Sequence, residues 1–297
     1  MKNKTKIFNS DRIFDVIITL VIVIITLLIL YPLYFVVIAS FSDPNLVANG
    51  QVILLPKGIN FDGYKYILRD NRIWTGYGNT LYYTVLGTVL AIGITIPAGY
   101  ALSRKDLPFR NGMMMLVIFT KFFSGGLIPT YLVVNSLHLV NTRGIIVILG
   151  AFSVFNLILC RTFFVNTMPD ELREAAEVDG CGTLRFFGQI VLPLSASIIA
   201  IMVLYYAVGY WNSFFNALVY LSDADKYPLQ MIMRDILISG QAINADVTDP
   251  EAYEEMLRIS MSIKYGVIII SSVPILCLYP FVQKHFVKGV MIGSVKG

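Results

Sequence analysis

The sequence predicts an all-α, polytopic membrane protein, and three observations support this fold class. Hydrophobic residues make up 56% of the 297 residues and charged residues only 14%, whereas a soluble domain carries roughly 25% charged residues. The mean hydropathy is +0.70. Uncharged apolar runs long enough to cross a bilayer, which takes about 20 residues, recur along the chain. We therefore expect residues 1–297 to form a single membrane domain.

Six segments are apolar and long enough to be transmembrane helices. They are residues 14–41, 79–103, 111–134, 144–166, 194–221 and 265–283. The first follows several basic residues, as a signal peptide does, but its uncharged run far exceeds the roughly 7–15 residues of a signal-peptide core. We therefore expect it to be a retained helix. The third is the least regular, because it contains Lys121 and the Ser124-Gly125-Gly126 sequence.

The distribution of Lys and Arg predicts the orientation of these helices. With a cytoplasmic N-terminus, most of the 23 basic residues fall in cytoplasmic segments, where they crowd the ends of the helices. Six transmembrane helices with both termini in the cytoplasm fit best. The loops at residues 42–78 and 222–264 are then outside, and loops of this length are usually functional. The first contains an amphipathic stretch at Phe61–Leu68, and the second a short apolar stretch at Tyr227–Ile238.

Several classes of function are excluded by what the sequence lacks. The three cysteines are far apart, the two histidines stand alone, and there is no CxxC motif, so we expect neither a disulfide nor a metal site. The chain has no GxxxxGK[ST] phosphate-binding loop and no basic tail. We therefore expect no bound cofactor, no ATP bound through that motif, and no nucleic-acid partner.

The segment Met168–Pro193 is a polar island between the fourth and fifth predicted helices. Its charged residues are Asp170, Glu171, Arg173, Glu174, Glu177, Asp179 and Arg185, whereas residues 144–160 and 186–222 carry no charge. A dense, net-acidic segment between two such runs must lie outside the lipid. The predicted orientation places it in the cytoplasm.

Local sequence signals divide this polar island into two short helices. Pro169 suits a first helical turn, and the acidic residues after it favour the positive end of a helix dipole. Gly180 and Gly182 allow the first helix to end, and a second helix follows at Thr183–Val191. Leu172, Ala175 and Ala176 form a small-residue stripe that suits docking on another protein. The alternative is an ordinary interfacial helix, although such helices usually carry Lys and Arg on their polar face.

The polar island also carries a specific resemblance. Glu174-Ala175-Ala176, then Gly180, then Ile190-Val191-Leu192-Pro193 matches every fixed position of the EAA signature of bacterial ABC-importer permeases. The whole chain resembles the sugar-type members related to the smaller permease of the maltose system. Its segments 123–131, 211–216 and 227–230 resemble the oligosaccharide and polysaccharide branch in particular.

The resemblance implies a subunit of a larger assembly in the bacterial cytoplasmic membrane. A second permease, two ATPase subunits that bind ATP and Mg²⁺, and an extracytoplasmic solute-binding protein would be its partners, with a carbohydrate as substrate. The residues implied in coupling to the ATPase are Glu174, Ala175, Ala176, Asp179 and Gly180. Lys288, Gly289 and Gly293 in the C-terminal tail would touch the ATPase pair. The chain itself would not be an enzyme.

The candidates for the substrate path are aromatic and neutral polar residues inside the predicted helices, together with one lysine. They are Asn79, Lys121, Asn156, Tyr210, Trp211, Asn212 and Asn216. Polar groups within a membrane domain usually face the bundle interior, but each aromatic residue could equally pack against lipid or a helix. Lys121 would cost about 2.5–3.5 kcal/mol at the bilayer centre. It could contact an anionic sugar, an interhelical partner or the membrane surface.

Three functions remain open on these observations. The first is the pore-forming subunit of an ATP-driven carbohydrate importer, or of an importer for another solute. The second is an ion-coupled carrier working alone, which normally shows broken helices with intramembrane ionisable groups; Lys121 alone gives it little support. The third is a membrane scaffold without a transport role, and the complete EAA signature argues against it.

Overall fold

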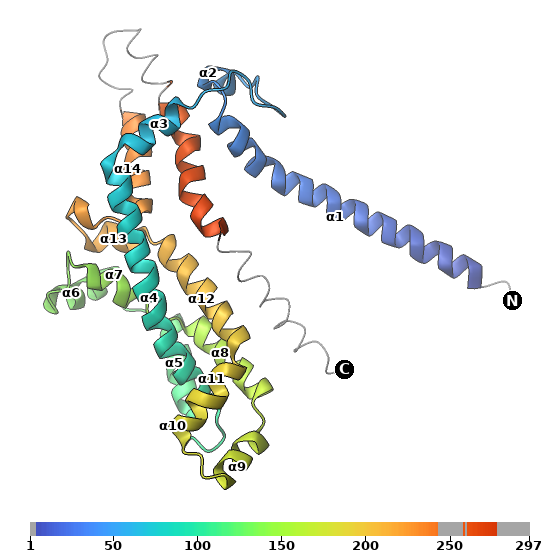
Figure 1. Ribbon diagram of the computed structural model, residues 1–297, viewed down its shortest axis with the longest axis vertical. Coiled ribbons are helices and arrows are strands. Elements are labelled where there is room, and N and C mark those ends of the chain that lie inside the picture. Colours follow the sequence, from blue (N-terminus) through green and yellow to red (C-terminus); the bar gives the residue numbers. More distant parts are fainter. Residues whose placement is uncertain (1–3, 243–257, 259, 278–297) are drawn as a thin grey trace. The chain divides into compact units, whose positions relative to one another are not determined.

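The computed structural model describes residues 4–242, 258 and 260–277, and every regular element in that part of the chain is a helix (Figure 1). Contacts within the chain separate it into two units. The first contains Met1–Asp70 and Ile236–Ile270, and the second contains Asn71–Asp235 and Ser271–Gly297. The predicted all-α class is therefore confirmed for the described residues. The C-terminal tail with Lys288, Gly289 and Gly293 lies outside them.

The first unit consists of α1 (Lys4–Ser40), α2 (Pro44–Ala48), α3 (Asp62–Arg69), the end of α14 (Leu229–Ala242) and the start of the last described helix, Ser260–Cys277. Helix α1 exposes apolar side chains on all sides, as expected of a helix in contact with lipid. Helix α3 lies at the amphipathic stretch noted at Phe61–Leu68 in the first long loop. Its Tyr64 hydroxyl hydrogen-bonds Ser40 Oγ at 2.8 Å, and the Tyr64 ring stacks on Phe41 at 5.5 Å.

The second unit is built around α4 (Asn71–Ser103), a helix with fourteen buried residues. Helices α8 (Val154–Thr167) and α12 (Ala196–Trp211) pack along it. Small residues allow this close approach, as they commonly do between transmembrane helices. A Cβ added to Gly87 would lie 2.2 Å from Tyr210 Cζ, and one added to Gly99 would lie 2.7 Å from Cys160 Sγ.

Two of the six predicted transmembrane helices, residues 111–134 and 144–166, are broken rather than continuous, and a third bend lies at the start of the predicted helix 194–221. Helices α5 (Arg110–Phe122) and α6 (Leu127–Ser136) meet at 111°, α7 (Arg143–Leu149) and α8 at 48°, and residues Thr183–Leu194 and α12 at 78°. The first break follows from Gly126, whose φ is 87°. The third includes Pro193, which has no N–H to continue a helical ladder. Hydropathy reports that a segment is apolar, but it does not report such changes of direction.

The continuous helices that are long and apolar enough to cross a membrane are Asp11–Ser40, Asn71–Ser103 and Ser260–Cys277. The number of possible crossings in the described residues rises to six when each bent pair counts as one. The predicted helix at residues 265–283 extends beyond the described part of the chain. The apolar stretch predicted in the second long loop forms α14 (Leu229–Ala242), after α13 (Phe215–Tyr220) and the short helix η2 (Ala224–Lys226).

Candidate functional site

The polar island folds as its sequence predicts. Helix α9 spans Asp170–Val178, and Gly180, with a φ of 71°, reverses the chain after it. The Cys181 N–H then donates to the Ala176 carbonyl oxygen at 2.8 Å, which closes the helix end. The predicted second helix is present as α10 (Thr183–Phe186), a π-helical turn η1 (Phe187–Val191) and α11 (Leu192–Leu194).

Helix α9 has three faces with different surroundings. Ala176 is buried, and Leu172 packs beside it against the cluster that contains Tyr100 and Phe164 of α4 and α8. Asp170, Arg173 and Glu177 lie on a second face, which carries ion pairs. Glu171, Glu174, Ala175 and Val178 lie on the third face and are all exposed. At 100° of rotation per residue, these sets occupy separate sectors of the helix.

This arrangement corrects the predicted docking face of α9. The stripe Leu172, Ala175 and Ala176 is not presented outward as a whole, because Leu172 and Ala176 pack into the protein's own core. Spacing alone could not distinguish an apolar stripe that packs on its own chain from one that packs on a partner. The exposed apolar residues near the segment are instead Val178 and Leu184, each 88% exposed. Their only signal in the sequence is that they are apolar and flank Gly180 in a polar region.

Ion pairs join α9 to the turn between α4 and α5. Lys105 Nζ lies 2.7 Å from Asp170 Oδ2, and Arg173 Nη1 lies 3.2 Å from Asp106 Oδ2. Asp106 also accepts hydrogen bonds from Arg104 of the same turn. The guanidinium of Arg104, with a further contribution from that of Arg173, lowers the pKa of Asp106 to about 2. The ammonium of Lys105 likewise lowers the pKa of Asp170.

A cavity of about 850 Å³ lies in the second unit, where α7 and α8 break and α12 ends. Three of the predicted substrate-path residues, Asn156, Tyr210 and Asn216, line it. Within the described residues, the side-chain amides of Asn156 and Asn216 make no hydrogen bond. Tyr205 also lines the cavity, with its ring 6.3 Å from that of Phe155. Aromatic faces and neutral amides are the groups that commonly hold sugar rings.

The other predicted substrate-path residues lie apart from this cavity. The Trp211 indole N–H donates to the Ser271 carbonyl oxygen at 2.9 Å, and the Asn212 amide donates to Val208 within its own helix. Lys121 is exposed in the last turn of α5, just before the break between α5 and α6. It makes no ion pair or hydrogen bond with the part of the chain that the structure describes.

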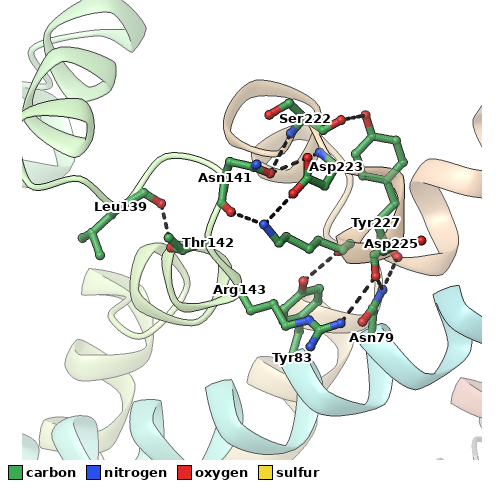
Figure 2. A network of polar contacts seen from close by, with 11 residues as sticks. Asn79, Tyr83, Leu139, Asn141, Thr142, Arg143, Ser222, Asp223, Asp225 and Tyr227 are labelled. Carbon is green, nitrogen blue, oxygen red and sulfur yellow. Dashed lines mark hydrogen bonds and ion pairs between the residues drawn. The ribbon is translucent and has the colours of Figure 1, made fainter.

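Asn79 belongs to a separate group, the polar clasp formed by Asn79, Tyr83, Asn141 and Lys226 (Figure 2). The Asn79 amide donates to the carbonyl oxygens of Asp225 and Tyr227, at 2.7 and 3.0 Å. The Tyr83 hydroxyl donates to the Lys226 carbonyl oxygen at 2.7 Å. These bonds fasten the start of the loop after α13 to α4.

Asn141 holds the same loop from the turn between α6 and α7. Its φ of 58° is a left-handed conformation that asparagine tolerates well. Its side-chain oxygen accepts the N–H groups of Ser222 and Asp223, and its carbonyl oxygen accepts Lys226 Nζ at 2.7 Å. The amide of Asn79 is thus one part of a connected structural network.

The helices, breaks and cavity define the class as a polytopic helical membrane protein, and comparison with known proteins defines the family. No protein-family model matches the sequence. The chain is 39% identical over 97% of its length to the polygalacturonan/rhamnogalacturonan transport system permease protein YtcP of Bacillus subtilis (strain 168), all of which is covered. It is equally similar, at 39% identity, to Protein LplC of the same organism, with 97% of each chain covered.

A solved structure agrees with these relatives. A chain of a bacterial ABC transporter involved in the import of the acidic polysaccharide alginate superposes with a TM-score of 0.82 at 32% identity. The match covers 93% of this chain and 98% of that one. The chain therefore belongs to the permease subunits of ABC transporters, which confirms the resemblance carried by its EAA signature.

Proposed function

We propose that this chain is the membrane-spanning permease subunit of an ATP-driven carbohydrate importer. The observation that carries the proposal is the 39% identity, across nearly the whole chain, to a permease of a polygalacturonan and rhamnogalacturonan transport system. Permease subunits of this family are not themselves catalytic. An ion-coupled carrier that works alone has no ATPase to bind, so the complete EAA signature argues against that function.

The proposed topology has six crossings of the bacterial cytoplasmic membrane, with each bent pair counted as one and both termini inside. The bias of Lys and Arg supports this orientation. It places α9 and the turn between α4 and α5 in the cytoplasm, and it places the polar clasp outside. The outer loop after α13, which starts at the clasp, is then available to an extracytoplasmic solute-binding protein.

The proposed partners are a second, homologous permease and two ATPase subunits that bind ATP and Mg²⁺. The exposed face of α9 would dock on an ATPase through Glu174, Ala175 and Val178, and Asp179 and Gly180 would fix the end of that helix. Leu184 adds exposed apolar surface beyond Gly180. Ala176 would then contribute by seating α9 on the permease core rather than by touching the ATPase.

Substitution of Val178 tests this docking face in the assembled transporter. Val178→Asp places a charge on an apolar contact, so we expect ATPase subunits to bind more weakly and carbohydrate-stimulated ATP hydrolysis to fall at least tenfold. Phe109→Asp is the matched control, because it places the same charge on an apolar residue that is also 88% exposed but lies outside the polar island. Normal ATPase binding and import by Val178→Asp would contradict the proposal.

The proposed substrate is an acidic oligosaccharide. Two proteins similar to this chain support that class: one is named for polygalacturonan, a polymer of a carboxylated sugar, and one imports the acidic polysaccharide alginate. The 850 Å³ cavity offers neutral amides for hydroxyl groups. Lys121, which has no ion-pair partner among the described residues, offers a cation within a broken helix. Import of oligogalacturonate but not of its neutral methyl ester is the expected result. Equal import of both would contradict an acidic specificity.

A further inference from the structure

Charged side chains join the cytoplasmic turn between α4 and α5 to α9 across a cavity, in addition to the apolar packing of Leu172 and Ala176 on the cluster that contains Tyr100 of α4. This cavity has a volume of about 290 Å³ and is lined by charged residues of both elements. The pairs Lys105–Asp170 and Asp106–Arg173 bridge it. Their partners on α9 are three residues apart, so both pairs pull on the same side of that helix.

The two ends of this bridge differ in what they are attached to. On one side, Arg104, Lys105 and Asp106 directly follow the last turn of α4. The Arg161 guanidinium of α8 also donates to the Leu102 carbonyl oxygen at 3.0 Å, which holds the end of α4 in place. On the other side is the helix whose remaining exposed face is proposed to meet the ATPase.

We propose that residues 104–106 form a second coupling element, and that the ion pairs Lys105–Asp170 and Asp106–Arg173 transmit movement of α9 to α4. This inference rests on the proposed function, because it needs an ATPase that moves α9. The residues are positioning residues: they touch neither ATP nor carbohydrate. Without them α9 would still pack through Leu172 and Ala176 on the cluster that includes Tyr100 of α4, but a tilt or slide along the cavity would displace α4 less.

Separate faces of α9 serve the two proposed roles, which are binding the ATPase and transmitting movement to α4. The ion-paired face, with Asp170, Arg173 and Glu177, is separate from the face that is free for the ATPase. Loss of the bridge should therefore leave docking and basal hydrolysis unchanged. What should change is the amount of carbohydrate moved for each ATP that is hydrolysed. A rigid-body movement of α9 displaces α4 only if the contacts between the two elements persist during the movement.

The ratio of carbohydrate imported to ATP hydrolysed is the decisive measurement, made on the complete transporter in lipid vesicles with its binding protein. A variant that merely reduces folding removes active transporters and lowers both rates in proportion, so the ratio stays constant. We expect Lys105→Met/Asp106→Asn to lower the ratio about three- to tenfold, a range typical of losing two exposed ion pairs. Basal ATP hydrolysis and ATPase binding should remain as in the native transporter.

Two further variants separate the bridge from a general loss of charge. Arg110→Met removes a cation that lines the same cavity but makes no ion pair within the described residues, so its ratio should equal the native one. Lys105→Glu should lower the ratio, and Lys105→Glu/Asp170→Lys should restore most of it by re-forming the pair with the charges exchanged. An unchanged ratio in Lys105→Met/Asp106→Asn would overturn the proposal, and so would a charge exchange that restores nothing.

The same experiment keeps this inference distinct from the proposed function. If the native transporter imports no carbohydrate at the expense of ATP, the proposed function fails. If native import is coupled and the Lys105→Met/Asp106→Asn variant is equally well coupled, only the bridge fails.

Discussion

The packing of Tyr210 between Gly87 and Gly150 gives a prediction in which the same glycine-to-alanine change has opposite effects on stability at Gly87 and at Gly93 of α4. A Cβ on Gly87 would lie 2.2 Å from Tyr210 Cζ, and one on Gly150 would lie 2.6 Å from Tyr210 Cε1. The ring cannot retreat from Gly87 without approaching Gly150. It is also held by its hydroxyl, which donates to the Val147 carbonyl oxygen at 2.6 Å. Gly87→Ala must therefore displace a side chain that is fixed on three sides.

The expected loss of stability follows from three contributions. Overpacking of a well-packed core costs about 1–3 kcal/mol. Loss of the hydrogen bond to Val147 leaves a buried polar group unsatisfied, at about 1–3 kcal/mol. Alanine gains about 1 kcal/mol over glycine in helix propensity, which offsets part of this loss. The free energy of unfolding of Gly87→Ala should therefore fall by about 1–5 kcal/mol.

Gly93→Ala is the matched control, because a Cβ there meets no atom within 4 Å. It changes the same residue type in the same helix, so it should leave stability unchanged or raise it by up to about 1 kcal/mol. Denaturation of the purified subunit in mixed micelles, followed by tryptophan fluorescence, measures both variants. Gly87→Ala/Tyr210→Leu should lose less than the two single changes together, because leucine has no atom where Cζ was. Additive losses, or a Gly87→Ala as stable as Gly93→Ala, would refute the steric reasoning.

Four further outcomes are expected. Asn156→Ala and Asn216→Ala should each lower the kcat/KM of import about five- to tenfold, because each would remove one of the proposed hydrogen bonds to the sugar; unchanged kinetics would exclude the residue from the substrate path. Lys121→Met should reduce import of oligogalacturonate and spare its neutral methyl ester, whereas equal effects on both would indicate a structural role. Asn141→Gly should cost about 1–3 kcal/mol of unfolding free energy through lost acceptors, and Asn141→Ala should cost more because of its positive φ. The difference between the native transporter and Lys105→Met/Asp106→Asn in carbohydrate imported per ATP should be constant between about pH 5 and 9. The lowered pKa of Asp106 confines the loss of the ion pair to below about pH 4. A fall of the native ratio by pH 6, with no fall in the variant, would contradict this.

The pH window in that prediction depends on the direction of each pKa shift. Asp106 and Asp170 have lowered pKa values in the folded protein, so their ion pairs contribute fully above the ordinary carboxyl pKa and weaken as the pH falls below it. The pKa of Lys105 is raised by Asp170, so its contribution is complete below the ordinary lysine pKa and is lost only above it. Both limits lie outside the physiological range.

The polar island shows how far local sequence reasoning extends. Its location outside the lipid depends on charge contrast, its first helix on Pro169 and the acidic residues, and its end on Gly180, and each of these is a property of adjacent residues. The structure has α9 and α10 at the predicted places. The residues that α9 contacts depend on distant parts of the chain. The ion pair between Asp106 and Arg173 joins residues far apart in sequence. The spacing of residues within the island therefore could not predict it.

The bent helices have a similar explanation. A window of apolar residues has the same mean hydropathy whether it is straight or bent, so residues 111–134 were predicted as one helix although Gly126 turns the chain there. The Ser124-Gly125-Gly126 sequence was a visible warning of irregularity. The 48° bend between α7 and α8 had no comparable signal beyond Gly150. That second bend is the one beside the 850 Å³ cavity, where the proposed substrate path lies.

Helix α4 links the features that the sequence could not bring together. Near its start, Asn79 and Tyr83 bond the loop after α13, and at its end the turn 104–106 bonds α9. Between these points the helix is continuous, and Gly87 and Gly99 hold it close to α12 and α8. A continuous helix packed along its length can tilt or slide, but it resists stretching. If movement of the ATPase displaces residues 104–106, and α4 with them, the displacement should therefore also reach the polar clasp near the other end of α4, on the proposed outer side of the membrane.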